Sequence, residues 1–157
     1  MPNWVMNDLR ISGEIEEVLL FIEENKTDDK FMFSTLVPEP ENNDDWYNWR
    51  VNNWGTKWDI DGNVDVQKVA DDCFRLYFTT AWEPPIAWLK SVIKNYPQLN
   101  FELNACDPGM DWHYVYEGIG GKLALIERGD FAEFASFWGM DPDEFDEDFM
   151  ENYEAVN

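Results

Sequence analysis

Residues 52–63, NNWGTKWDIDGN, contain the side chains whose types and spacing come nearest to a known ligand-binding pattern. Oxygen-bearing side chains alternate at Asp59, Asp61 and Asn63 and, just beyond this stretch, at Asp65, as the first ligands of a calcium-binding loop do. Such a loop requires glycine in its sixth position and glutamate in its twelfth, whereas here Gly62 is fourth and Ala70 is twelfth. We therefore expect a hairpin turn at Asp61-Gly62, with a metal site as the alternative.

Other catalytic and cofactor-binding patterns find no support in the sequence. His113 is the only histidine, and the two cysteines, Cys73 and Cys106, lie far apart and outside any CxxC pattern. No Ser-His-Asp or Cys-His arrangement is indicated, and residues 118–121 (GIGG) lack the strand-to-helix setting of a dinucleotide-binding motif. We expect no catalytic site, no metal and no cofactor, His113 in a packing or surface role, reduced thiols, and a hairpin turn at 118–121.

Five tryptophans could form an aromatic platform for a ligand such as a sugar, although in a small domain such a cluster is more often core. They are Trp46, Trp49, Trp54, Trp58 and Trp82. We expect them to clamp the segment that leads into the second strand onto the core.

Apolar periodicity defines the elements of the first half of the chain. It predicts a strand over residues 3–11, with one apolar face made by Val5, Leu9 and Ile11. A helix follows to about residue 25, with a core stripe made by Ile15, Val18, Leu19 and Ile22. Residues 31–45 predict a loop anchored by Phe31, Phe33 and Leu36. We then expect a short helix over 44–53 and strands over 56–60 and 64–69.

The second half predicts a strand over 73–80, a helix from Pro84-Pro85 to about residue 95, and a strand over 99–105. The helix has a core stripe made by Ile86, Leu89, Val92 and Ile93. Two more strands are expected over 112–118 and 121–127. The order strand, helix, strand, strand, helix, strand is that of a ferredoxin-like split βαβ sandwich. We expect an α+β domain over 1–127 with a widened antiparallel sheet, and an acidic helical extension over 128–157 packed on it.

The charge balance restricts the partners. The chain has 33 Asp and Glu against 11 Lys and Arg, a formal charge of −22, yet it is 45% hydrophobic and 17% aromatic, unlike a disordered acidic protein. Such a surface repels nucleic acid directly and attracts a basic protein. No stretch approaches the ~20 apolar residues of a membrane span, and the N-terminus has no signal-peptide features, so we expect a cytoplasmic protein without membrane contacts.

The carboxylates are densest beyond residue 140. Asp141 and Pro142 suit the start of a helix, on which Phe145, Phe149 and Tyr153 would share one face. The eight acids would extend over roughly 20 Å of helix, within a factor of about two of the charge density of duplex DNA. We expect them to bind the partner: Asp141, Asp143, Glu144, Asp146, Glu147, Asp148, Glu151 and Glu154.

Several segments together resemble a known family. MPNWVMNDLRISG, NNWGTKWD, TTAWEPP, YPQLNFELN and EGIGG follow one another in this order. Through these segments, residues 1–125 resemble the phage- and plasmid-borne proteins that carry a YubB-type ferredoxin-like domain. The resemblance implies the fold and a mobile-element origin, but no activity and no catalytic residues. Small acidic proteins of phages and plasmids often block host defence proteins that bind nucleic acid.

These observations lead to one expected function and two alternatives. We expect a non-enzymatic nucleic-acid mimic that blocks a basic nucleic-acid-binding host complex, such as a CRISPR effector or a restriction enzyme, in the bacterial cytosol. The first alternative is a protein–protein interaction module that uses its aromatic and Phe/Tyr surfaces, with acidity serving solubility only. The second is a hydrolase or metal enzyme.

Overall fold

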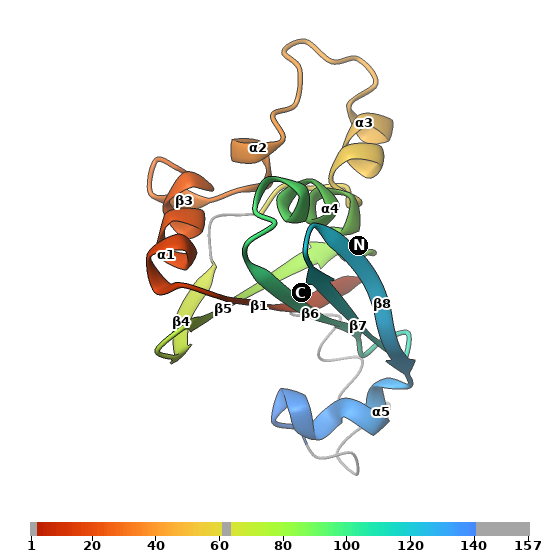
Figure 1. The fold of residues 1–157 in the computed structure, drawn as a ribbon. Helices are drawn as coiled ribbons and strands as arrows, with labels where there is room; N and C mark the ends of the chain where they lie inside the picture. Colours follow the sequence, from red (N-terminus) through yellow and green to blue (C-terminus); the bar gives the residue numbers. More distant parts are fainter. Residues whose placement is uncertain (1–2, 61–63, 141–157) are drawn as a thin grey trace.

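The computed structural model describes residues 3–60 and 64–140. Its largest element is a six-stranded antiparallel sheet with the strand order β4-β5-β1-β6-β7-β8 (Figure 1). These strands are β1 (Trp4–Ser12), β4 (Asp65–Ala70), β5 (Cys73–Ala81), β6 (Asn100–Asp107), β7 (Trp112–Ile119) and β8 (Lys122–Gly129). The short strands β2 (Lys26–Thr27) and β3 (Lys30–Phe31) form a separate hairpin.

Two longer helices connect the strands of the sheet. The segment that contains α1 (Ile15–Glu24) leads from β1 to β4, and α4 (Ile86–Asn95) leads from β5 to β6. In each case one antiparallel strand lies between the two strands that the connection joins. This is the split βαβ arrangement, so the predicted ferredoxin-like α+β fold is confirmed. The predicted widening of the sheet is confirmed too, since β7 and β8 continue it beyond β6.

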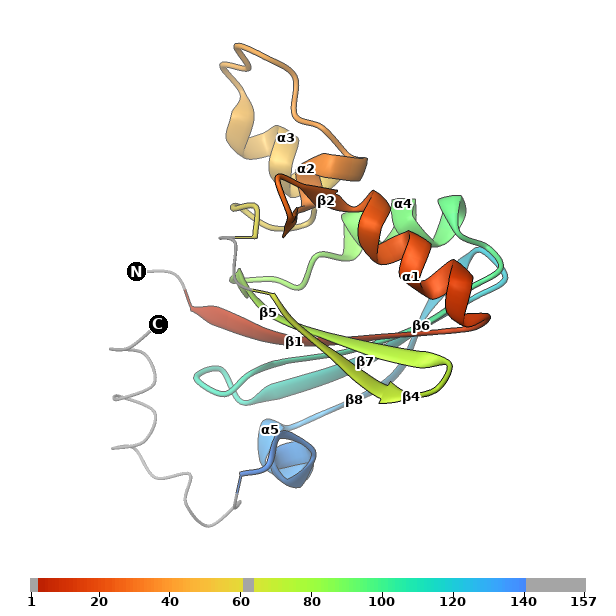
Figure 2. The same ribbon diagram turned by 90° about the vertical axis from the view of Figure 1, so that its left-hand side faces the viewer.

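Both helices cover one face of the sheet, and the main core lies between them and the strands (Figure 2). The apolar face predicted for β1 is completely buried there: Val5, Leu9 and Ile11. The stripe predicted for α1 needs one correction, because Leu19 is exposed. The buried residues of α1 are Val18, Phe21 and Ile22. Helical rotation places residue 19 beside the core-facing stripe rather than on it.

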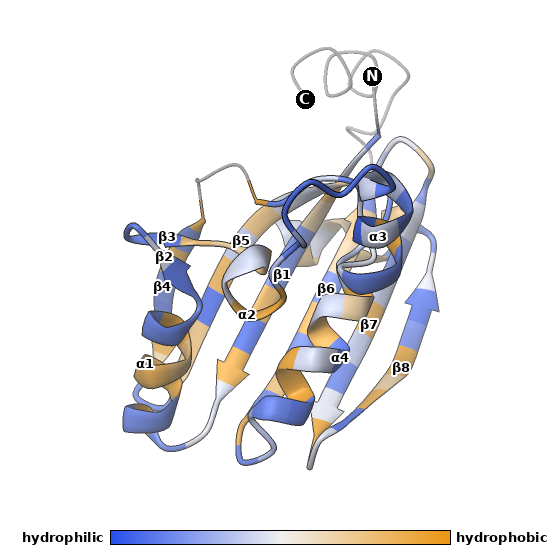
Figure 3. Cartoon of the chain, turned by 90° about the horizontal axis from the view of Figure 1, so that it is seen from above, coloured by the Kyte–Doolittle hydropathy of each residue, from blue (hydrophilic) through white to orange (hydrophobic). Residues whose placement is uncertain are grey.

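The stripe predicted for α4 is confirmed. Leu89, Val92 and Ile93 are buried and Ile86 packs against the core. Trp88 is also completely buried, and its ring centroid lies 5.8 Å from that of Phe31 and 4.9 Å from that of Phe33. Figure 3 shows α1 and α4 lying over the strands, with apolar and polar residues interspersed along both helices.

Residues 31–60 form a lobe beyond the helices, with α2 (Phe33–Leu36) and α3 (Trp46–Asn53) joined by an arched loop (Figure 1). The predicted anchors Phe31 and Phe33 are buried and Leu36 packs against the core, although 33–36 is helical. The strand predicted over 56–60 is wrong. This segment forms bends, because side chains rather than a neighbouring strand bind its backbone. The predicted turn at Asp61-Gly62 lies outside the described residues.

The opposite face of the sheet is partly covered by α5 (Phe131–Phe134) and the 3₁₀ helix η1 (Ala135–Trp138) (Figure 2). A small second core is buried beneath them: Met6, Cys106, Phe131 and Ala135. Residues 131–138, which belong to the predicted helical extension, are helical, with 3₁₀ geometry in their second half. Within residues 3–60 and 64–140, no helix has the length and apolar character needed to cross a membrane.

The contact between α4 and β7 depends on the absence of a side chain at Gly118. A Cβ atom there would lie 2.9 Å from Cγ1 of the buried Ile93, and closer still to its Cδ1. We expect Gly118→Ala to lower the free energy of unfolding by about 1–3 kcal/mol, measured by urea denaturation. Ile93→Val removes Cδ1, so the double variant should lose less than the sum of the two single variants. Additive losses would contradict this steric explanation.

Candidate functional site

The acids predicted to bind a partner all lie outside the described residues, in the segment 141–157. They are Asp141, Asp143, Glu144, Asp146, Glu147, Asp148, Glu151 and Glu154. Their role as a partner-binding surface therefore stays a prediction. The functional surfaces that follow are built from residues 3–60 and 64–140.

A second concentration of carboxylates lies at the edge of the domain formed by α1, the β2–β3 turn and the β4–β5 turn. The amide of Gly13 donates to the carbonyl oxygen of Asp72 at 3.1 Å, which holds the β4–β5 turn against the start of α1. Three lysines share this edge with nine acids, and all the acids except Glu17 are exposed. We name the nine acids the acidic edge: Glu14, Glu16, Glu17, Glu23, Glu24, Asp28, Asp29, Asp71 and Asp72.

The lobe carries exposed aromatic rings around the ammonium of a lysine. Nζ of Lys57 lies 4.8 Å from the ring centroid of Trp58, 5.7 Å from that of Trp82 and 6.0 Å from that of Tyr47. These rings attract a cation at such distances. The side chains are nevertheless open to solvent, with exposed fractions of 41% for Trp58, 47% for Trp82 and 39% for Tyr47. We name these four residues the aromatic cage.

Arg50 lies next to the aromatic cage and holds its residues in place. Its guanidinium lies 4.9 Å from the ring centroid of Trp46 and 5.6 Å from that of Trp58, and these two rings stack at 5.5 Å. Its Nη2 pairs with Oε2 of Glu39 at 2.8 Å, and its Nη1 donates to the carbonyl oxygen of Lys57 at 3.5 Å. The position of Arg50 thus sets both the orientation of Trp58 and the backbone that carries Lys57.

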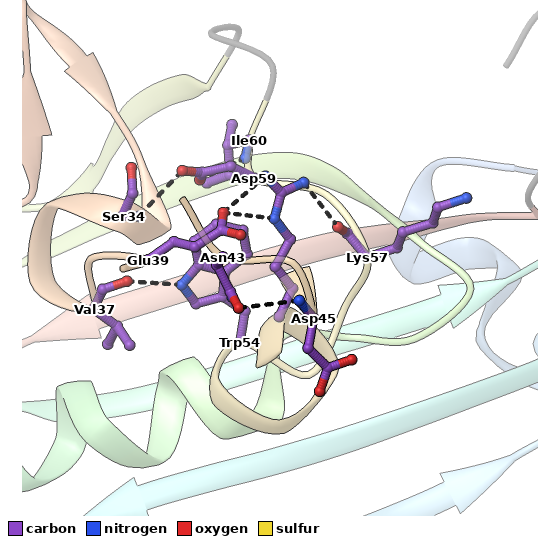
Figure 4. Close-up of polar contacts among 10 residues, drawn as sticks. Ser34, Val37, Glu39, Asn43, Asp45, Trp54, Lys57, Asp59 and Ile60 are labelled. Carbon is purple, nitrogen blue, oxygen red and sulfur yellow. Dashed lines mark hydrogen bonds and ion pairs between the residues drawn. The ribbon is translucent and has the colours of Figure 1, made fainter. Parts of the chain in front are cut away.

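Three consecutive residues attach the cage to the core. Trp54 is buried, and its indole Nε1 donates to the carbonyl oxygen of Val37 at 2.9 Å (Figure 4). Gly55 has φ +89°, and a Cβ there would lie 2.9 Å from the first backbone nitrogen of α4, so glycine is required by both conformation and space. The hydroxyl of Thr56 donates to the carbonyl oxygen of Ala81 at 2.9 Å.

Trp82, directly after β5, is held in an unusual conformation. Its φ of +67° lies in the left-handed region, which is strained for a bulky side chain, and its amide donates to the carbonyl oxygen of Asn3 at 2.8 Å. Strain of about 1–3 kcal/mol persists only where the surroundings impose it, and such residues concentrate at functional sites. A strained, exposed tryptophan makes the aromatic cage a candidate binding site for a cationic or flat apolar group.

The structure corrects the predicted tryptophan clamp in part. Trp54 is buried and Trp49 packs against the core, as predicted. Trp46, Trp58 and Trp82 instead belong to the surface cluster. The physical reason is that α3, which carries Trp46, stands on the outer side of the lobe and has no buried residue. Trp46 therefore stacks on Trp58 and lies against Arg50 instead of entering the core.

Asp59, the first residue of the calcium-like pattern, has a structural role. Its Oδ1 accepts hydrogen bonds from the amides of Phe33 and Ile60, both at 2.7 Å. Its Oδ2 accepts one from the amide of Ser34 at 3.2 Å (Figure 4). The carboxylate thereby caps the start of α2. Asp61 and Asn63 lie outside the described residues. Within those residues, no group of three or more His, Cys, Asp or Glu side chains could hold a metal ion.

His113 is a buried packing residue, one of the two roles predicted for it. Its Nδ1 accepts a hydrogen bond from Nε1 of Trp138 at 3.0 Å, so Nε2 carries the proton and donates to Oδ1 of Asn104 at 3.0 Å. Its ring stacks on that of Phe134 at 3.9 Å. Burial lowers the pKa of His113 to about 4. Both nitrogens are engaged, so the ring joins η1 to the sheet and has no free nitrogen for proton transfer.

A cluster of charged side chains lies on the same face of the sheet as His113. The carboxylate of Asp8 is completely buried and pairs with Arg75 and, at 3.3 Å, with Arg10. Burial raises the pKa of Asp8, and the two guanidinium groups offset part of that rise. Both cysteines are free thiols, and burial raises the pKa of each, which makes the reactive thiolate scarce.

Asp59 offers a direct test of how the lobe is held. We expect Asp59→Asn to lower the free energy of unfolding by about 1–2 kcal/mol in urea denaturation, because the negative charge and one acceptor at the start of α2 are lost. Asp44→Asn changes an exposed carboxylate of the same lobe and should alter stability by less than about 0.5 kcal/mol. Equal effects of the two substitutions would show that the cap does not stabilise the lobe.

His113 predicts a pH dependence of stability. Its pKa of about 4 in the folded state lies below the ordinary 6.5, so the unfolded chain binds more protons between these values. The contribution to stability is therefore present above pH 6.5 and decreases as the pH falls toward 4. Between about pH 7 and pH 5, the wild type should lose roughly 2 kcal/mol more than His113→Gln, which lacks the titrating ring. Parallel profiles in urea denaturation would refute this.

Arg50 and Lys57, the two cations of the aromatic cage and its support, were not identified from the sequence. Arg50 follows Trp46 by one helical turn, and Lys57 directly precedes Trp58, so a basic residue within reach of a tryptophan was the available signal. The third ring of the cage, Tyr47, gave no comparable signal, because it meets Lys57 only through the bend after Gly55.

Comparison with known proteins supports the fold. Residues 54–119 match the family model described as the ferredoxin-like domain in Api92-like protein. Among solved structures, the chain is similar to protein Api92 from Yersinia pseudotuberculosis, with a TM-score of 0.50 and 12% sequence identity over 62% of this chain and 38% of that chain. No curated protein matches the chain. The chain thus spans well under half of the Api92 chain, and the likeness to it is one of fold. The YubB-type resemblance and the mobile-element origin stay predictions, whereas residues 54–119 are similar to the ferredoxin-like domain of Api92-like proteins.

Proposed function

We propose that the protein is a non-enzymatic inhibitor that binds the basic nucleic-acid-binding surface of a host defence complex, such as a CRISPR effector or a restriction enzyme. Its carboxylates would take the places of nucleic-acid phosphates opposite lysine and arginine side chains of that complex. The formal charge of −22 on an aromatic-rich domain is the observation that carries the proposal.

The distribution of charge supports this function. Of the 33 acids, 24 lie within the described residues, together with all 11 basic residues, so the domain is strongly acidic even without residues 141–157. The acidic edge concentrates nine of those 24 acids along α1 and two adjacent turns. Residues 141–157 add eight more carboxylates and no base. Self-repulsion of this size opposes folding, and a basic partner would relieve it.

The proposal also includes an origin and a location. We infer that the chain comes from a phage or plasmid and acts in the bacterial cytosol, where such a complex operates. The resemblance of residues 1–125 to YubB-type proteins of mobile elements supports the origin, and the free cysteines suit a reducing compartment.

The inhibitor function predicts binding that depends on salt and on carboxylates. Immobilised protein should capture basic nucleic-acid-binding proteins from bacterial lysate at about 150 mM NaCl and lose most of them at about 500 mM, because salt screens exposed charges. Duplex DNA should displace the captured proteins. Neutralising part of the acidic edge should weaken capture roughly tenfold. The variant that does this is Glu14→Gln, Glu16→Gln, Asp28→Asn and Asp29→Asn.

A second variant examines the carboxylates beyond residue 140. Replacing the eight acids of 141–154 by their amides should weaken capture at least as much, since they are the densest on the chain. Capture that is equally strong at both salt concentrations, or after both neutralisations, would exclude the inhibitor function.

The aromatic cage supports a second candidate function, a protein-interaction module in which acidity serves solubility only. Its rings are exposed, and Trp82 is held in a strained conformation. In this case the double variant Trp58→Ala with Trp82→Ala would abolish capture, whereas neutralising the carboxylates would leave capture intact. Under the inhibitor function, neutralising the carboxylates weakens capture more than the tryptophan substitutions do.

A further inference from the structure

The edge of the domain opposite the acidic edge carries a hollow with a different charge. Residues of α4 and of the start of β8 line it. These two elements lie on the side of the sheet away from α1 (Figure 3). The hollow is open to solvent and has a volume of about 500 Å³. Its walls are Lys90, Ser91, Lys94, Gly121, Lys122 and Leu123.

The fold brings three lysines together here. Lys90 and Lys94 lie four residues apart and therefore on the same side of α4. Lys122 begins β8, directly after a two-residue hairpin turn in which both glycines have positive φ, +59° at Gly120 and +81° at Gly121. The predicted turn in GIGG is thus confirmed, and it returns the chain so that Lys122 faces α4 across the hollow.

Among the described residues these lysines form no ion pair with a carboxylate, although acids outnumber bases threefold in the chain. Within residues 3–60 and 64–140, five of the 11 basic side chains form ion pairs: Arg10, Lys26, Arg50, Lys68 and Arg75. Lys90, Lys94 and Lys122 form none. The dipole of α4 favours Lys94 in its last turn, but it does not account for Lys122 on the facing strand.

Three ammonium groups around one hollow repel one another, and a bound anion removes that repulsion. We propose that this hollow is a binding site for a diphosphate group, either inorganic or at the end of a nucleotide. Ammonium groups are compact charges that bind phosphate oxygens. The hydroxyl of Ser91 donates to the carbonyl oxygen of Ala87 at 3.4 Å, and its hydrogen can turn from that long contact toward a bound anion. The acidic remainder of the surface repels a long polyanion, so a short phosphate chain fits where a nucleic-acid strand does not.

Titration of the isotope-labelled full chain tests the site, with sodium pyrophosphate in one arm and ADP in the other, at about 25 mM NaCl to limit screening. We expect saturable changes in the amide resonances of Ser91, Gly121 and Lys122. Equal affinity for the two probes would identify the diphosphate alone as the ligand. Tighter binding of ADP, with additional changes at Leu123, would identify a nucleotide. Absence of saturable changes with both probes would overturn the proposal.

A pair of charge-matched variants separates a site from general attraction. Lys90→Gln with Lys94→Gln should weaken pyrophosphate binding by roughly tenfold or more. Lys26→Gln with Lys30→Gln removes the same charge from the β2–β3 hairpin and should change binding by no more than about twofold to threefold. Lys30, Lys90 and Lys94 are exposed and Lys26 is half-buried, so circular dichroism verifies that both variants are folded. Equal weakening by the two variants would overturn the proposal, whatever the outcome for the inhibitor function.

Discussion

Aromatic packing between the two longer helices and the sheet holds this molecule together against its own charge. Phe21 of α1 lies 5.5 Å from Phe101 of β6 and 5.0 Å from Tyr96 at the end of α4, measured between ring centroids. Trp88 of α4 contacts Phe33 of the lobe in the same core. Large buried rings contribute more than their area alone, which is the kind of stabilisation that a chain with a charge of −22 requires.

The same packing separates three surfaces that the chain mixes in sequence. Because α1 and α4 both cover one face of the sheet, their outward sides lie near opposite edges, one with the acidic edge and the other with three lysines. The lobe rises from the core at Trp54 and Gly55, and it carries the aromatic cage away from both. Each surface therefore has its own chemistry, and each can be altered by exposed substitutions that leave the core intact.

Much of the fold follows from local pattern. The alternation in β1 and β5 and the stripe of α4 are strong because one face of each element packs on the main core. The predicted core position of Leu19 and the predicted strand over 56–60 are wrong for opposite reasons. Leu19 is apolar but lies just beside the buried stripe, and 56–60 alternates in polarity but finds no neighbouring strand, since Arg50 and Asp59 bind its backbone. Apolar character alone indicates neither which side of a helix is buried against the core nor which groups form hydrogen bonds with the backbone of a segment.

By itself, the sequence determined the order of the six strands of the main sheet and of the two longer helices, the ferredoxin-like class and the excess of carboxylates, because these depend on side-chain period and composition. Only the tertiary structure decided which tryptophans are buried and which surround Lys57, since α3 and the end of β5 meet through the bend after Gly55. It also decided that Lys122 faces Lys90 and Lys94. Contacts of this kind join residues distant in the chain, and no periodicity within one element encodes which side of a neighbouring element it will face.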